Sequence, residues 1–63
     1  MTQKELLYVE DACKHEDNII KILDESINYL EDYNLIKLFK NDLKKHQTMK
    51  EKLMSLMESK INE

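Results

Sequence analysis

The chain has 63 residues, of which 41% are hydrophobic and 37% are charged, and its net charge is −3. A chain of this length forms one domain at most. Its core contributes only a few kcal/mol of folding stability unless disulfides, metals or a second chain add to it. Assembly with a second chain is therefore the first expectation. The net acidic charge argues against a basic phosphate-binding face, so we expect no nucleic-acid partner.

Membrane and secretory segments are not expected either. The apolar runs fall far below the roughly 20 residues that a transmembrane helix needs, and the first residues lack a signal-peptide pattern. The single cysteine, Cys13, has no partner for an internal disulfide, which fits a reducing compartment. A cytoplasmic protein is the resulting expectation.

The sequence contains no Gly and no Pro. These residues make the tight turns and bulges of β-proteins, so their absence argues against a β or α/β fold. The abundance of Leu, Ile and Met beside many charges is typical of amphipathic helices. We therefore predict an all-α fold.

A first helix is predicted over residues 3–31. Thr2 and Glu5 have the spacing of a capping box, in which the hydroxyl and the carboxylate each accept a hydrogen bond from the other residue's backbone N–H. Apolar residues then recur at steps of three and four, which is the period of one helix face. This first stripe is Leu6, Val9, Cys13, Glu16, Ile20, Leu23, Ile27 and Leu30, broadened by Ala12, Ile19, Ile22 and Tyr29. Only Glu16 interrupts it with a charge.

The apolar phase breaks within residues 31–34, which predicts a turn there and a second helix over residues 34–61. Asp32 or Asn34 can cap that helix. Asn can also adopt the left-handed conformation that Gly usually supplies. The second stripe is Leu35 or Ile36, Phe39, Leu43, His46, Met49, Leu53 and Leu56 or Met57, ending near Ile61. Here His46 is the interruption.

Charge supports an antiparallel hairpin. Residues 1–32 hold nine acidic residues and three Lys, a balance of −6, whereas residues 33–63 hold four acidic residues and seven Lys, a balance of +3. An acidic helix attracts a basic one, within one hairpin and equally between two copies. We therefore expect a two-helix hairpin, one domain over residues 1–63, that dimerises into a four-helix bundle or binds a helical partner protein.

Glu16 and His46 should meet at mid-length of the hairpin. With the turn near residues 32 and 33, residue 46 lies level with about residue 19, within one helical turn of residue 16. An inward carboxylate and imidazole can form a buried hydrogen-bonded pair, an acid–base pair or half of a metal site. In di-metal carboxylate bundles one helix supplies a Glu and the next a Glu-x-x-His. Position 43, where that second Glu would stand, is Leu43.

Asp42 and His15 lie near this pair but do not restore the ligand count, so a structural contact is favoured over a metal site. Glu16 and His46 remain the candidate metal ligands, with Fe, Mn or Zn as the candidate ions. Cys13 is interpreted as a buried structural thiol, because no neighbouring group marks it as a nucleophile. We expect no catalytic residue and no enzymatic activity.

Several short segments resemble one known family. They are Leu6-Leu7-Tyr8 with Glu10-Asp11 leading into His15-Glu16, the segment Leu30-Glu31-Asp32, and Lys45-His46-Gln47 followed by Leu53. Together they resemble the small ferritin-like proteins of spore-forming Firmicutes related to the spore coat protein F (Coat F) domain. The resemblance implies a half-bundle that completes a ferritin-like four-helix bundle by dimerising. It also implies that Glu16 and His46 are remnants of, or substitutes for, metal-ligand positions, and that a spore-associated location is possible.

Three functions follow as hypotheses. The preferred one is a non-enzymatic structural or interaction protein, spore-coat-like by resemblance, that forms a homodimeric four-helix bundle. The second is a small regulator or inhibitor that docks its apolar face on a target protein. The third is a ferritin-like metal-binding protein with an incomplete di-metal site.

Overall fold

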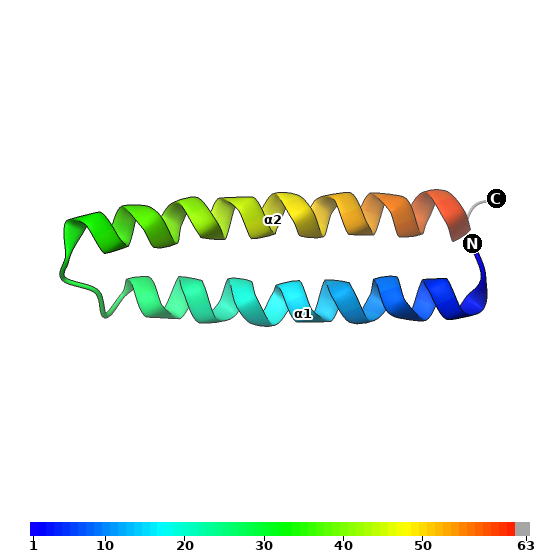
Figure 1. The fold of residues 1–63 in the computed structure, drawn as a ribbon, viewed down its shortest axis with the longest axis horizontal. Helices are drawn as coiled ribbons and strands as arrows, with labels where there is room; N and C mark the ends of the chain where they lie inside the picture. Colours follow the sequence, from blue (N-terminus) through cyan, green and yellow to red (C-terminus); the bar gives the residue numbers. More distant parts are fainter. Residues whose placement is uncertain (62–63) are drawn as a thin grey trace.

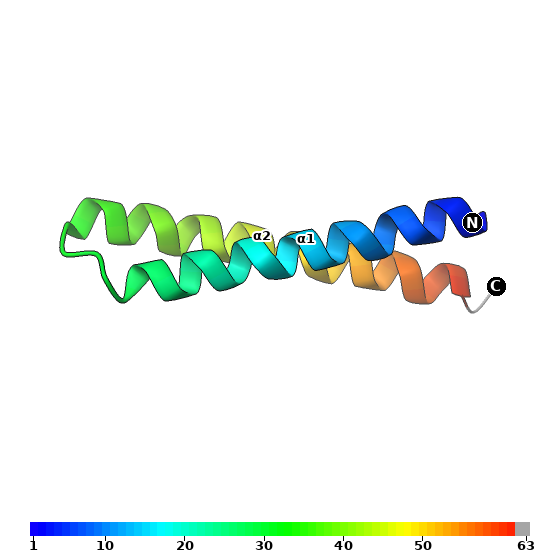
Figure 2. The same ribbon diagram turned by 90° about the horizontal axis from the view of Figure 1, so that it is seen from below.

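Two long helices, α1 (Gln3–Ile27) and α2 (Tyr33–Ile61), make up the fold in a computed structural model (Figure 1). The structure describes the backbone of residues 1–61 and the side chains of residues 1–59. Within that range there is no strand, which confirms the all-α prediction. The helices run antiparallel, with the start of α1 and the end of α2 at one end of a rod measuring 47 × 14 × 11 Å. Figure 2 shows them crossing at a shallow angle near mid-length.

The N-terminus of α1 is held by the predicted capping box. The Thr2 hydroxyl accepts a hydrogen bond from the Glu5 amide at 3.1 Å, and the Glu5 carboxylate accepts one from the Thr2 amide at 3.0 Å. Because the first N–H groups of a helix have no partner inside it, these bonds satisfy two donors that would otherwise need water. The start of α1 therefore lies where the sequence places it.

The end of α1 differs from the prediction. The helix stops at Ile27 rather than near residue 31, and Asn28 is its C-cap. The amides of Asn28, Tyr29 and Leu30 each donate to the carbonyl three residues earlier, at 3.0 to 3.3 Å, which tightens the last turn into 3₁₀ geometry. No described residue has a positive φ, so the connection is made without the left-handed Asn considered from the sequence.

Asp32 is the residue that starts α2. Its Oδ1 accepts hydrogen bonds from the amides of Asn34 at 2.8 Å and Leu35 at 3.2 Å, and its carbonyl accepts the Ile36 amide at 3.0 Å. An N-cap residue is itself non-helical, so the chain must leave α1 before it reaches Asp32. Of the two candidate caps, Asp32 is confirmed, while Asn34 lies inside the helix.

The seam between the helices is made by the two predicted stripes. Its residues are Leu6, Val9, Cys13, Glu16, Ile20, Leu23 and Ile27 on α1, and Ile36, Phe39, Leu43, His46, Lys50, Leu53 and Met57 on α2. Two choices left open in the sequence resolve to Ile36 and Met57, since Leu35 and Leu56 are exposed. Met49 was wrongly placed in the stripe, because it is exposed and Lys50 takes its position. The side chain of Ile61 lies outside the described residues.

This seam contains little true interior. Among the described residues only Cys13, at 9% exposure, is buried, and the other apolar seam residues are half-buried. The burial of Cys13 agrees with a structural thiol. Neither helix, as far as the structure describes it, has the length and hydropathy needed to cross a membrane.

The cap at Asp32 gives a first prediction. Asp32→Ala should lower the free energy of unfolding by about 1 kcal/mol, because two amides of the first turn of α2 lose their acceptor. Chemical denaturation followed by circular dichroism at fixed protein concentration measures the change. Glu31→Ala, one residue earlier on the exposed connection, is the matched control and should shift the value by less than about 0.5 kcal/mol. Equal effects of the two substitutions would contradict the assignment of Asp32 as the cap.

Candidate functional site

A polar contact joins the two helices at mid-length. The Nδ1 atom of His46 lies 2.6 Å from Oε2 of Glu16, and the side chains are 35% and 14% exposed, respectively. The structure thus brings together the two residues that the sequence singles out. A hydrogen bond of this length to an ionised carboxylate is charge-assisted and stronger than a neutral one. In the neutral imidazole, donation from Nδ1 leaves Nε2 with its lone pair available for another ligand.

A second cross-helix pair stands beside the first. The ammonium of Lys50 contacts the Asp17 carboxylate. The hydrogen bond to Asp17 raises the pKa of Lys50 above its ordinary value of 10.5, although partial burial opposes this rise. Lys50 is therefore a cation at neutral pH. The sequence pattern did not reveal this pair, because apolar periodicity favours Met49 at that level. A Lys can occupy a seam by packing its methylenes against apolar neighbours while its charge reaches the surface.

One chain offers too few metal ligands around Glu16 and His46. No group of three or more His, Cys, Asp or Glu side chains among the described residues could hold a metal ion. His15 is exposed and Asp42 is half-buried, and neither is hydrogen-bonded to the pair. One hairpin therefore offers one carboxylate and one imidazole, and a fuller site would need donors from a second copy.

The two broad sides of the hairpin differ sharply in chemistry. Successive helix residues are turned by about 100°, so the residues just before and just after each seam residue point to opposite broad sides. Because α1 and α2 are antiparallel and face each other, the preceding residues of both helices point to the same side. One side of the molecule therefore collects the preceding residues, and the other side collects the following ones.

The side formed by the preceding residues is called the apolar face below. It consists of Glu5, Tyr8, Ala12, His15, Ile19, Ile22 and Ser26 from α1, and Leu35, Leu38, Asp42, Lys45, Met49, Lys52 and Leu56 from α2. Most of the exposed large hydrophobic residues of the helices lie here, among them Ile22 at 62% exposure. The apolar face is thus a hydrophobic strip along both helices, interrupted by Glu5, Asp42, Lys45 and Lys52.

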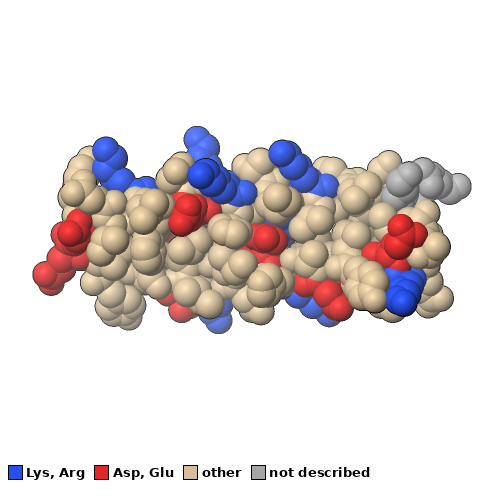
Figure 3. Space-filling model, viewed as in Figure 1, with Lys and Arg blue, Asp and Glu red and all other residues tan. Residues whose placement is uncertain are grey.

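The side formed by the following residues is called the charged face. It consists of Leu7, Glu10, Lys14, Asp17, Lys21 and Asp24 from α1, and Lys37, Lys40, Lys44, Gln47, Glu51, Met54 and Glu58 from α2. Only Leu7 and Met54 are apolar. Such a surface is typical of contact with water. Figure 3 shows one broad side of the hairpin as largely uncharged surface with a few separate acidic groups on it, and with Lys side chains along its α2 edge.

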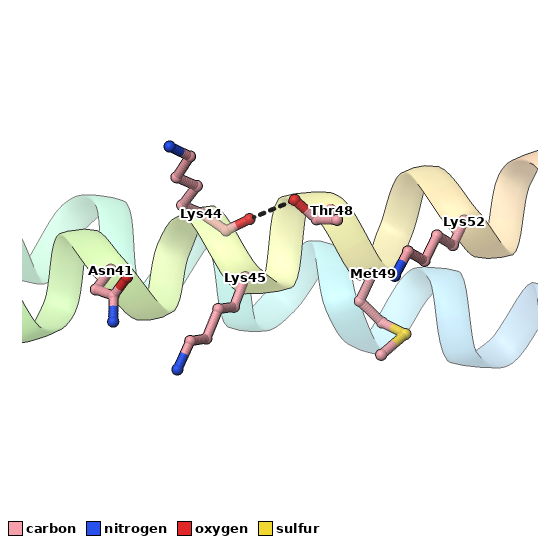
Figure 4. Close-up of a pocket in the computed structure, with 6 residues that line it drawn as sticks. All are labelled: Asn41, Lys44, Lys45, Thr48, Met49 and Lys52. Carbon is pink, nitrogen blue, oxygen red and sulfur yellow. Dashed lines mark hydrogen bonds between the residues drawn. The ribbon is translucent and has the colours of Figure 1, made fainter.

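A shallow hollow lies at that α2 edge. It is lined by Asn41, Lys44, Lys45, Thr48, Met49 and Lys52, all from α2 (Figure 4). Lys45 and Met49 point to one side of the helix, whereas Lys44 points away from them. Thr48 donates a hydrogen bond to the Lys44 carbonyl at 3.0 Å, so its hydroxyl is turned back onto the helix. Lysine side chains therefore form a basic rim around the hollow, and the exposed thioether of Met49 lies beside them.

No protein-family model, curated protein or solved structure matches this chain. The resemblance to the Coat F domain therefore rests on the short segments quoted from the sequence.

The contact between Glu16 and His46 gives a second prediction. Glu16→Gln and His46→Gln should each destabilise the protein by about 1 kcal/mol, the lower end of the range for such groups because His46 reaches solvent. The double variant should cost less than the two single effects added together, since the second substitution removes no further contact.

A double-mutant cycle on unfolding free energies measures this coupling. The matched comparison is the cycle of Asp17→Asn with Lys50→Met, whose carboxylate is more exposed and whose coupling should be smaller. Additive effects of Glu16→Gln and His46→Gln would show that the contact contributes nothing specific to stability.

Proposed function

We propose that this protein is a small non-enzymatic interaction protein that acts as a homodimeric four-helix bundle, spore-coat-like by its resemblance to the Coat F domain. The observation that supports the proposal is the excess of exposed surface. The chain exposes 5194 Å², whereas a folded monomer of 7.6 kDa exposes about 4,300 Å². The difference, about 900 Å², is close to the roughly 800 Å² that each partner buries in a standard protein interface.

The position of that surface supports a self-complementary contact. Most of the exposed hydrophobic residues of the helices lie on the apolar face, while the charged face already suits water. Stacking two apolar faces turns two side-by-side helix pairs into a bundle with one shared core. A symmetric dimer uses the same patch on both copies, so one apolar strip suffices to close the assembly.

Matched substitutions on the two faces test this proposal. Leu38→Glu on the apolar face should raise the dimer dissociation constant by at least about tenfold, because it places a charge in the shared core. Leu7→Glu on the charged face is the control, since both leucines are 53% exposed in one chain. Sedimentation over a range of concentrations measures both constants. Equal effects of the two substitutions, or none, would contradict the apolar face as the dimer contact.

A target protein with an apolar helix or groove is the alternative occupant of this face. That function would give a stable monomer at micromolar concentration, together with saturable binding of a target that Leu38→Glu abolishes and Leu7→Glu preserves.

Metal binding is a second candidate function, favoured by the contact between Glu16 and His46. A carboxylate that fixes a histidine ring through Nδ1 is common around metal-ligating histidines. Two copies would supply two Glu and two His. We expect Zn, Mn or Fe to raise the melting temperature of the wild-type protein, and His46→Gln to abolish that rise. His15→Gln, the other histidine, is the matched control. An unchanged melting temperature with each metal would remove this candidate.

A further inference from the structure

We propose that, in the homodimer, α1 of each copy lies against α2 of the other, with the two-fold axis parallel to the helices. This inference rests on the proposed dimer and adds the arrangement of its helices. Two hairpins stacked through their apolar faces can pair in two ways. Either unlike helices lie face to face, or each helix lies against its own copy.

The charge on the helices favours the unlike pairing. Residues 1–32 carry a balance of −6 and residues 33–63 carry +3. On the apolar face itself, the α2 half holds Lys45 and Lys52 beside the hollow against one acid, the half-buried Asp42, which is not part of the hollow's lining. If each helix packed against its own copy, these Lys side chains would line both sides of a contact between two α2 helices. Like charges brought together across an interface oppose association and select against that arrangement.

The hollow on α2 suits the helix that the unlike pairing places there. Asp17 contacts Lys50, and Glu16 contacts His46, so the α2 residues around the hollow lie level with residues near 16 and 17 of α1. Rotation about an axis parallel to the helices leaves every residue at its own level. The α1 helix of the second copy would therefore bring Ala12 and Ile19 toward Met49, and Asp11, which lies on the outer side of α1 next to the apolar face, toward Lys52. Apolar groups would meet the thioether, and an acid would meet the basic rim.

The two pairings predict different neighbours for His15. It lies on the apolar face, exposed and at the middle of α1. In the unlike pairing its neighbours are residues 49 to 52 on the α2 helix of the other copy, and the two α1 helices lie diagonally across the bundle. Adjacent helices lie about 8–10 Å apart and diagonal helices about 1.4 times farther, so a short thiol cross-linker distinguishes them. In the like pairing, the two copies of His15 face each other at the centre.

The experiment uses single-cysteine variants of the 63-residue chain in which Cys13→Ala removes the native thiol. His15→Cys and Lys52→Cys proteins are mixed in equal amounts and treated with a short bismaleimide, and the joined peptides are identified by mass spectrometry. We expect the product that joins residue 15 of one chain to residue 52 of the other to predominate over both self-products. Lys21→Cys mixed with Lys44→Cys, a pair at matching levels on the charged face, is the control and should give little product.

A predominant product that joins two copies of His15→Cys would overturn the unlike pairing while leaving the dimer intact. A dimeric mass without the 15-to-52 product would do the same. A monomeric mass with no product in any mixture would overturn both the pairing and the proposed dimer.

Discussion

Two helices lying side by side share a single seam, and this geometric constraint governs everything else in the molecule. Each helix can turn only one stripe of side chains toward its neighbour, so both flanks of that stripe remain open. The consequence is visible in the burial, since Cys13 alone is buried among the described residues. A protein of this size has little stability to spare, and the hydrophobic surface left on one flank is large enough to matter. The charged face shows that the exposure is selective, because the opposite flank carries almost no apolar residues.

The polar contacts inside the seam set the alignment of the two helices. An all-apolar seam would tolerate sliding by one turn, since Leu, Ile and Met substitute for one another in packing. The hydrogen bond between Glu16 and His46 and the ion pair between Asp17 and Lys50 are satisfied only in one alignment. Partly buried polar pairs often cost stability relative to apolar ones, and fixing an alignment is their best-attested role. Glu16 and His46 also form the only carboxylate–imidazole contact between the two helices within the described residues, so a metal site would be sought there.

Sequence reasoning recovered the helices, the capping box and the meeting of Glu16 with His46, because these depend on local hydrogen bonds and on a strict three-and-four spacing. It missed the end of α1 by four residues. Tyr29 and Leu30 continue the apolar period, which favours a longer α1. Asp32 must remain outside the helix to cap α2, however, so α1 ends at Ile27 and the intervening residues form the turn. It also chose Met49 over Lys50, since a periodicity argument scores a Lys as polar and ignores its apolar stem. The residues that make one broad face hydrophobic and the other charged can be read in the sequence. They could be assigned to the two faces only once the structure had shown which residues form the seam.

We propose that a second copy of the chain covers the apolar face. The most direct test is the mass of the wild-type protein in solution, measured by sedimentation equilibrium across the micromolar range. The homodimer should have twice the 7.6 kDa mass of one chain and should dissociate only on dilution. A mass of 7.6 kDa throughout that range, with the helices still formed, would contradict it.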